Sequence, residues 1–209
     1  MREDTRTITF AAIVCVVVSL LLSVTAAVLK PAQRANEAFD VKRNIVKAFG
    51  VDISAMARPE IEATFEKHVF EDKAGDLPIF TWTDEDADAP SKYAFPVSGK
   101  GLWSMLYGYL SLESDLETIA GISFYKHGET PGLGAEIEKP WFLSQFAGKK
   151  LYADGAATDF LVVKPGSTLT ETSVDGISGA TLTGKGVQAL IQKDALAYAD
   201  YFKSIKGGN

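Results

Sequence analysis

Cysteine is almost absent from the chain, which has a single cysteine, Cys15, among 209 residues. One cysteine excludes an intrachain disulfide and a metal site built from cysteines. Because Cys15 lies inside an apolar run, we expect it to pack as a small hydrophobic residue. Basic charge is also in short supply, with 21 Lys and Arg against 27 Asp and Glu and a formal net charge of −6. That balance disfavours a nucleic-acid partner, which needs a basic surface.

Charge is missing altogether from one long stretch near the amino terminus, between Ile8 and Leu29. As a helix this stretch would be about 33 Å long, enough to cross a hydrocarbon core of about 30 Å. It predicts a single transmembrane helix over residues 8–29, within an N-terminal segment of residues 1–34. A cleaved signal peptide is the alternative, because Val24–Ala26 resembles a small-residue cleavage site. A retained anchor is preferred, since the apolar run is longer than a typical signal core and continues past that site.

The charges that flank this stretch do not decide its orientation. Two basic residues precede it, Arg2 and Arg6, and two follow it, Lys30 and Arg34. The number of basic residues is therefore equal on the two sides. With either an anchor or a signal peptide, the remaining domain, residues 35–209, is expected on the far side of the membrane.

The remainder of the chain combines helical and strand patterns. Apolar residues follow Pro31 at helical spacing, with Gly50 as a stop, and a second helix is predicted from Pro59 with Ile61, Phe65 and Val69 on one face. Short aromatic or β-branched runs then predict strands over residues 77–83, 92–98, 107–113, 118–127 and 159–166. A final amphipathic helix has one apolar stripe, made of Val187, Ile191, Ala195, Tyr198, Phe202 and Ile205. This order predicts an α+β domain with a largely antiparallel sheet packed by helices.

The stretch "DGISGATLTGKG", residues 175–186, places four glycines and several hydroxyls directly before the final helix. Helix N-termini offer unpaired N–H groups and a positive dipole end to an anion, and glycines let a ligand approach the backbone. Thr181 and Thr183 supply hydroxyls beside such a site, and a strand-like approach to the helix would point both in the same general direction. A phosphate is the natural ligand. The stretch is not a Walker loop, and no histidine or cysteine lies nearby in sequence to activate a threonine. An ordinary glycine-rich turn with a hydroxyl cap is the alternative.

A second candidate stretch is "HGETPGLGAEI", residues 127–137, directly after a predicted strand. Pro131, Gly132 and Gly134 indicate a tight loop in which polar groups adjoin the apolar Leu133. Such a mixture could seat a flat heteroaromatic ring, with Leu133 against its face. A plain hairpin connection is the alternative.

Together these two stretches resemble the family of covalent FMN-binding domains. "SGAT", Ser178 to Thr181, resembles the flavinylation motif of that family, with Asp175 at the usual upstream position, and "ETPGLG", Glu129 to Gly134, resembles its flavin-ring loop. "GKGLWSMLYGYLSL", Gly99 to Leu112, is similar to the C subunit of the sodium-translocating NADH:quinone oxidoreductase. One departure is "TLTGKG", where Lys185 adds a positive charge in place of a small polar residue.

The resemblance implies one cofactor, FMN, and a set of residues that bind it. Thr181 would carry the FMN phosphate as a phosphoester, made by a separate Mg-dependent flavin transferase that uses FAD. The phosphate and ribityl chain would be lined by Ser178, Gly179, Ala180, Thr183 and Gly184, with Asp175 nearby. The ring would be lined by Glu129, Thr130, Leu133 and Gly134, and Trp103 would help to close the pocket.

The resemblance also implies a role as one subunit of an enzyme, an electron relay on the periplasmic side of the bacterial inner membrane. Electrons would pass from NADH, through a flavoprotein subunit and iron–sulfur subunits, to this FMN, and then to a second covalent FMN subunit and quinone. The expected partners are these subunits, the flavin transferase and the lipid bilayer. The sequence itself shows no NADH site and no ligands for an iron–sulfur cluster. Two alternatives stay open: the G subunit of an Rnf-type ferredoxin:NAD oxidoreductase, and a membrane-anchored FMN-binding sensor module.

Overall fold

The computed structural model describes residues 2–85 and 87–207, which fall into two compact units, one up to Asp40 and one from Val41 onward. The first unit consists of most of helix α1 (Arg2–Ala48), which runs without a break through Pro31. Proline lacks an N–H, so this position forgoes one helical hydrogen bond. The helix is therefore continuous where the sequence suggested a fresh start after Pro31.

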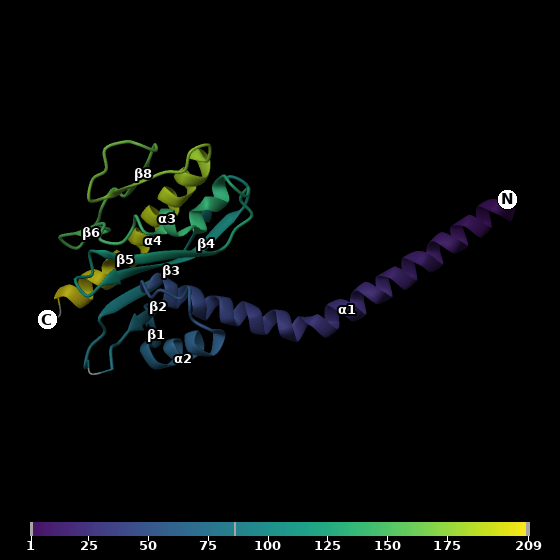
Figure 1. The fold of residues 1–209 in the computed structure, drawn as a ribbon, viewed down its shortest axis with the longest axis horizontal. Helices are drawn as coiled ribbons and strands as arrows, with labels where there is room; N and C mark the ends of the chain where they lie inside the picture. Colours follow the sequence, from purple (N-terminus) through teal and green to yellow (C-terminus); the bar gives the residue numbers. More distant parts are fainter. Residues whose placement is uncertain (1, 86, 208–209) are drawn as a thin grey trace. The chain divides into compact units, whose positions relative to one another are not determined.

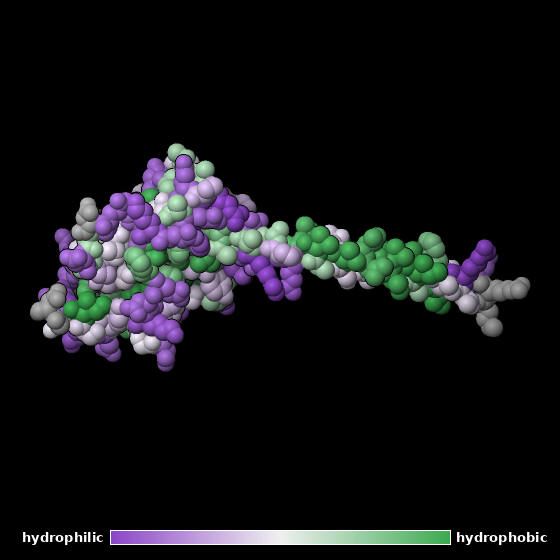
Figure 2. Space-filling model, turned by 90° about the horizontal axis from the view of Figure 1, so that it is seen from below, coloured by the Kyte–Doolittle hydropathy of each residue, from purple (hydrophilic) through white to green (hydrophobic). Residues whose placement is uncertain are grey.

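Helix α1 is long and apolar enough to cross a membrane, with a mean hydropathy of 2.8 in its most apolar window and no residue of that window buried. Figure 2 shows its hydrophobic surface as an almost continuous band of green. A signal sequence near an N-terminus would pass the same test. The predicted span over residues 8–29 lies inside this helix.

The second unit is built on a five-stranded antiparallel sheet in which every strand pairs with its neighbours in sequence (Figure 1). Its strands are β1 (Val69–Ala74), β2 (Leu77–Trp82), β3 (Lys92–Lys100), β4 (Met105–Glu113) and β5 (Ile119–Lys126). β3 and β4 pair over nine residues each, with Phe95 opposite Leu110. The prediction of a largely antiparallel sheet in an α+β domain is confirmed.

Both faces of this sheet are buried, because consecutive residues of a strand point to opposite sides. On one face Phe95 and Val97 of β3 join a large core with the apolar stripe of the final helix, α4 (Thr181–Gly207). Phe95 lies 4.5 Å from Tyr198 between ring centroids. On the other face Ala94 packs with Ile45 and Phe49, at the end of α1, in a second cluster. Figure 1 shows α4 on one side of the sheet and α2 (Arg58–His68) on the other.

Short elements connect β5 to α4 and complete the domain. They are η1 (Gly134–Glu138), α3 (Pro140–Leu143), β6 (Tyr152–Ala153), β7 (Ala156–Ala157), β8 (Leu161–Val163) and β9 (Ser173–Asp175). β6 and β7 form an antiparallel pair, whereas β8 and β9 run parallel. β8 and β9 lie beside the start of α4 and so form part of the candidate site.

Three local predictions are corrected by the structure. Val69 is the first residue of strand β1 and not part of the helical face with Ile61, and the sequence did not predict β1 at all. Four of its six residues are exposed, so the strand lacks an apolar alternation. The predicted strand over residues 159–166 contains only the three residues of β8. The final helix begins at Thr181, several residues before its apolar stripe.

Candidate functional site

The site begins with a tight turn that delivers the chain into α4. The N–H of Ala180 donates to the carbonyl of Ile177 at 3.0 Å, and Gly179 between them has a φ of 76°. A side chain at that φ would be strained, which explains the glycine of "SGAT". Helical bonding then starts at once, since the N–H of Gly184 donates to the carbonyl of Ala180 at 3.0 Å. Ala180 therefore caps the helix without a side-chain acceptor.

This cap leaves the N–H groups of Thr181, Leu182 and Thr183 without an acceptor among the described residues. They are the orphan donors of a helix N-terminus, and they lie at the positive end of the helix dipole. Thr181 and Leu182 are exposed, as are Ser178 and Gly179 just before them, so this end of the helix faces solvent, whereas Thr183 is buried. The geometry favours an anion at this point.

The two threonines of the motif point in different directions. We expected a strand-like approach to the helix that would aim Thr181 and Thr183 the same way, and the structure shows that this was wrong. Both lie in the first turn of α4, where residues two apart are separated by about 200° around the axis. Thr181 is exposed, whereas Thr183 is buried, with 1% of its surface accessible. Only the hydroxyl of Thr181 is available to a ligand or a modifying enzyme.

The hydroxyl of Thr183 is committed to a buried carboxylate, that of Glu129. It donates to Glu129 Oε2 at 2.6 Å, and the backbone N–H groups of Trp103 and Ser104 donate to Oε1 at 2.9 and 3.3 Å. Glu129 is 5% exposed. The carboxylate therefore ties together three segments: the loop after β3, the loop after β5 and the first turn of α4. Glycines make room for it, since a Cβ on Gly101 would approach Oε1 to 2.6 Å.

The hydrogen bonds around Glu129 keep it ionised. Burial alone raises the pKa of this carboxyl, but the bonds from the Thr183 hydroxyl and from the backbone of Trp103, Ser104 and Leu102 outweigh it, and the pKa lies below its ordinary value of 4.5. An ionised carboxylate held by these donors is a structural tie, not a free proton carrier. The resemblance implied that Glu129 and Thr183 line the flavin; the structure places both in the interior of the domain.

The other residues of the predicted ring loop lie beside the turn that precedes α4. Leu133 is 42% exposed, and a Cβ on Gly179 would approach its Cδ2 to 3.0 Å, so the two sequence motifs adjoin. Gly134 is buried against Thr183 and Glu129, and Thr130 is exposed. Trp103 is 71% exposed and contributes its backbone N–H, not its ring, to the tie around Glu129.

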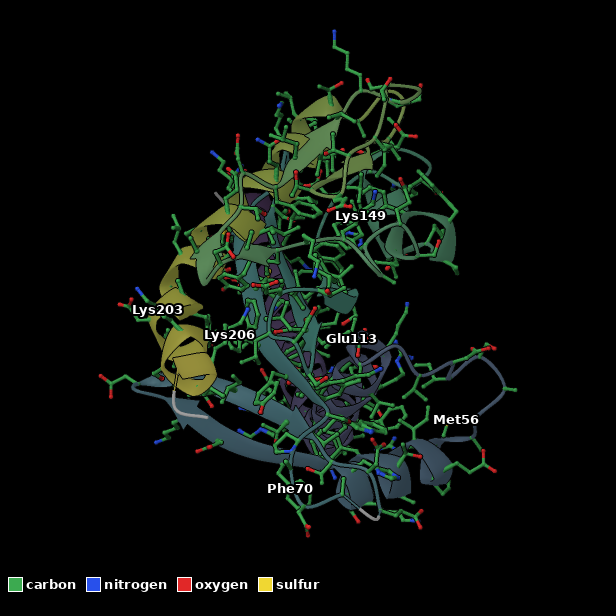
Figure 3. All side chains as sticks on the ribbon, turned by 90° about the vertical axis from the view of Figure 1, so that its left-hand side faces the viewer. Met56, Phe70, Glu113, Lys149, Lys203 and Lys206 are labelled. Carbon is green, nitrogen blue, oxygen red and sulfur yellow. The ribbon has the colours of Figure 1, made fainter. Side chains whose placement is uncertain are left out.

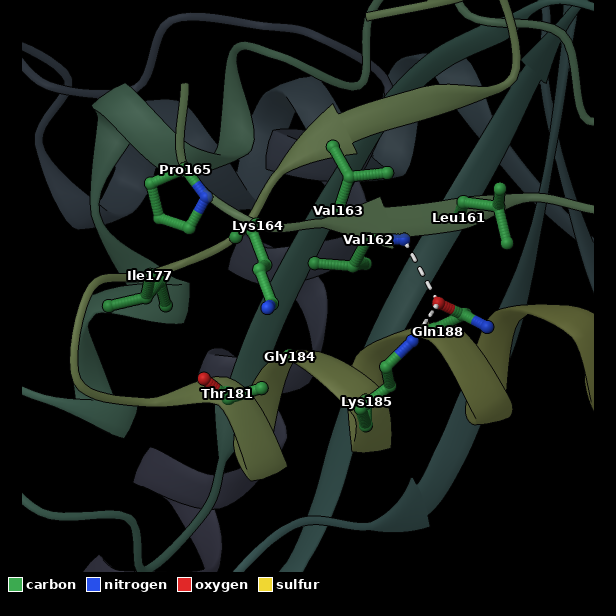
Figure 4. Close-up of a pocket in the computed structure, with 11 residues that line it drawn as sticks. Leu161, Val162, Val163, Lys164, Pro165, Ile177, Thr181, Gly184, Lys185 and Gln188 are labelled. Atoms are coloured by element: carbon green, nitrogen blue, oxygen red, sulfur yellow. Dashed lines mark hydrogen bonds between the residues drawn. The ribbon is translucent and has the colours of Figure 1, made fainter. Parts of the chain in front are cut away.

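A cleft of about 240 Å³ opens on the Thr181 side of the helix (Figure 4). One wall is β8 and the segment that follows it, and the other is the face of α4 that carries Thr181, Gly184, Lys185 and Gln188. The remaining lining residues are Leu161, Val162, Val163, Lys164, Pro165, Gly176 and Ile177. The cleft therefore combines an apolar wall with two lysines and the exposed threonine.

Asp175 holds in place the segment that follows β8 and forms part of the cleft wall. Its Oδ1 accepts the backbone N–H of Gly166 at 3.1 Å, and its own N–H donates to Gln145 Oε1 at 2.8 Å. The turn that Asp175 holds is closed by the N–H of Ser167, which donates to the carbonyl of Lys164 at 3.1 Å. Asp175 thus fixes the segment that presents Lys164 to the cleft.

Several residues of the cleft wall were missed by sequence reasoning. Lys164 and Leu161–Val163 were assigned only to a strand, and Gln188 only to a helix. Their spacing carried no signal, because β8 reaches α4 through tertiary packing. Lys185 was noticed only as a departure from the motif.

The family model described as FMN-binding domain matches residues 101–196, which include both motifs and the cleft.

Relatives over most of the chain place it within a narrower family. A protein of Vibrio campbellii, named as the C subunit of the Na(+)-translocating NADH-quinone reductase, is 35% identical over 82% of this chain and 83% of its own length. The protein of that name from Pseudomonas aeruginosa is 34% identical over 91% of this chain and 90% of its own. The chain belongs to the family of C subunits of the Na(+)-translocating NADH-quinone reductase, and the relatives are thus subunits of an oxidoreductase.

Solved structures agree with this family and with the fold. The crystal structure of the same subunit from Parabacteroides distasonis superimposes with a TM-score of 0.73 at 33% identity, over 83% of this chain and 96% of that one. The structure of NqrC from Shewanella oneidensis gives 0.71 at 27% identity, over 81% and 99%. With the apolar helix α1, the family indicates association with a membrane.

Proposed function

We propose that this chain carries FMN covalently on Thr181 and relays electrons within a sodium-translocating NADH:quinone oxidoreductase. The observation that carries the proposal is the contrast between the two threonines: the Thr181 hydroxyl is exposed at the first residue of α4, whereas that of Thr183 is bound to Glu129. A phosphate joined to Thr181 would lie beside the three N–H groups at the start of the helix.

The residues around Thr181 fit the phosphate end of FMN. Three backbone donors and two lysines surround the hydroxyl, and no Asp or Glu is among the residues that line the cleft. The hydroxyl of threonine is a poor nucleophile unless a base activates it. In the described structure no histidine forms a hydrogen bond with Thr181. Attachment by a separate flavin transferase suits this arrangement, because the described residues supply the acceptor hydroxyl without a histidine base bonded to it.

Leu133 is the proposed contact for the isoalloxazine ring. It is the exposed apolar residue that touches the turn before Thr181, with the exposed Thr130 in the same loop to meet the polar edge of the ring. When bound, FMN would supply the electron-carrying chemistry. The protein would position the flavin and set the polarity around it. The hydrogen bonds of Glu129 hold the first turn of α4 against the loop after β3 and the loop after β5.

The partners follow from the proposed relay. Electrons would arrive from the iron–sulfur and NADH-oxidising flavoprotein subunits and leave for a second FMN subunit and quinone. Helix α1 would anchor the chain in the inner membrane, with the FMN domain on the periplasmic side. A covalent bond keeps the carrier from diffusing away in a compartment without an assured flavin pool.

The test is to purify the intact membrane assembly and to measure two properties of this chain. Mass spectrometry of the denatured chain should show the added mass of FMN less one water, and NADH should reduce that flavin when quinone is withheld. A chain of unmodified mass from an active assembly would refute covalent attachment. A covalent flavin that stays oxidised while NADH is consumed would refute the relay and favour a sensor.

A further inference from the structure

Two lysines line the cleft, one on each wall. Lys164 follows β8, on the turn that Asp175 holds, and Lys185 lies one helical turn after Thr181 on the same face of α4 (Figure 4). Residues four apart on a helix are neighbours on its surface. Gln188 holds the head of Lys185 near the opposite wall, because its Oε1 accepts both Lys185 Nζ at 3.4 Å and the N–H of Val162 at 3.2 Å.

The local charge here is opposite to that of the whole chain. Formal net charge is −6, yet the cleft is lined by two lysines and by no acidic residue. In the described parts of the chain neither lysine forms an ion pair with a carboxylate. Some other lysines are paired with carboxylates, such as Lys150 with Asp115 at 3.1 Å and Lys206 with Glu117. Two unneutralised cations beside an exposed hydroxyl and the positive end of a helix make an anion site.

We infer that Lys164 and Lys185 hold the phosphate of the flavin on Thr181, so that the cleft between β8 and α4 receives the phosphate and ribityl end and the ring lies outside it. This rests on the proposed attachment at Thr181. In that attachment the Thr181 oxygen bonds to the FMN phosphorus of FAD and the bond between the two phosphates breaks. AMP leaves with the electron pair of that bond, and the hydroxyl proton passes to a base of the transferase. The lysines stabilise the negative charge on the phosphates, first in FAD and then in the phosphodiester.

The test follows covalent flavin incorporation over time in the full chain incubated with the transferase and FAD. Lys164→Gln and Lys185→Gln should each slow incorporation about three- to tenfold, as expected for loss of a charge-assisted contact at an exposed site, and the double variant should be slower still. Arginine at either position should restore much of the rate. Added salt should slow the wild type and barely affect the double variant. The matched control is Lys203→Gln, on the last turns of α4 (Figure 3), about 27 Å further along the helix than Lys185.

Two further readouts separate a phosphate contact from other roles. In loaded protein the ³¹P resonance of the phosphodiester should shift in the double variant, while the visible flavin spectrum stays as in wild type. Leu133→Lys should change the visible flavin spectrum and leave the ³¹P resonance as in wild type. Wild-type incorporation in the double variant, or slow incorporation with an unshifted ³¹P resonance, would overturn the inference and leave attachment at Thr181 intact. If the wild-type chain acquired no flavin at Thr181, the proposed function itself would fail.

Discussion

At the residue scale, the tie between Glu129 and Thr183 determines which parts of the site are rigid. One buried carboxylate in the loop after β5 accepts hydrogen bonds from the loop after β3 and from the first turn of α4. Removing any of these donors would leave a charged oxygen without a hydrogen-bond partner, which lowers stability. The resemblance implies that Glu129 and Thr183 both line the flavin, and that stays a prediction; the structure adds that their side chains bond to each other. Sequence could not show that their side chains point inward, since that depends on how β5 and α4 pack.

Replacing Thr183 by valine should therefore lower stability without removing the flavin. Valine keeps the shape but leaves Glu129 Oε2 without its donor, which costs about 1–3 kcal/mol. Urea unfolding of the full chain in detergent would measure the loss, and Thr183→Ser, which keeps the hydroxyl, should lose less. Equal stability of wild type and Thr183→Val would mean that the tie contributes nothing.

Glu129 should also make stability depend on acidity. Its pKa in the folded protein lies below the ordinary 4.5, so its contribution is present above pH 4.5 and is lost as the pH falls through the folded value. Comparing urea midpoints of wild type and Glu129→Gln from neutral pH downward isolates this residue from the other carboxylates. The gap between the two proteins should be widest near neutral pH and should narrow below about pH 4.5. A gap that does not change with pH would show that ionisation of Glu129 is irrelevant.

At the element scale, the position of α4 depends on a close approach to the end of β3. A Cβ on Gly186 would come within 2.5 Å of the Lys100 carbonyl oxygen, and one on Gly99 within 2.6 Å of Leu190 Cβ. These glycines bring the first turns of α4 against the loop that also donates to Glu129. The packing of one element on another therefore places Thr181.

Gly186→Ala tests this packing. Alanine favours a helix by about 1 kcal/mol, but here its methyl group would meet a backbone carbonyl that cannot move aside, so we expect a net loss of about 1–3 kcal/mol. Gly207→Ala is the matched control on the same helix, because nothing lies within 4 Å of a Cβ there. Thermal unfolding should rank Gly186→Ala below wild type and Gly207→Ala level with or above it. The reverse order would refute the close-packing argument.

The helices and strands that could be predicted from the sequence are those whose burial imposes a regular hydrophobic pattern. The aromatic runs predicted β2 to β5 almost at their bounds, and the apolar stripe predicted the body of α4, because burial on a sheet imposes a pattern. The start of α4 was missed, because the apolar stripe begins only at Val187. β1 and the short pair β8 and β9 gave little pattern, since most of β1 is exposed and β8 is three residues long. The two motifs lie together in the structure, with Leu133 beside the turn that precedes Thr181. The cleft with Lys164 could not be found, because its two walls are joined only by folding.

At the scale of the whole molecule, the boundary between the apolar unit and the folded domain lies within helix α1. The domain unit begins at Val41, and the last turns of α1 supply Ile45 and Val46 to its second core cluster. One continuous helix thus belongs to both units, and its apolar part is exposed in the isolated chain.

We predict that residues 35–209 lie in the periplasm and residues 1–7 in the cytoplasm. The reason is the resemblance to covalent FMN-binding domains, which implies attachment of the flavin on the periplasmic side, and the equal flanking charges do not oppose this orientation. A phosphatase fused to the C-terminus should be active, whereas a fluorescent protein that folds only in the cytoplasm should be dark there and bright at the N-terminus. A dark N-terminal fusion with an inactive C-terminal phosphatase would reverse the assignment.

The central claim is that Thr181 carries the flavin, and one comparison tests it most directly. Wild type, Thr181→Val and Thr183→Val would each be co-expressed with the flavin transferase, denatured, separated on a gel and examined for flavin fluorescence, and the fluorescent peptide would be mapped by mass spectrometry. Because Thr181 is exposed and Thr183 is bound to Glu129, we predict a dark Thr181→Val band and fluorescent wild-type and Thr183→Val bands, with the flavin on the peptide that contains Thr181. A fluorescent Thr181→Val band beside a dark Thr183→Val band would contradict the account.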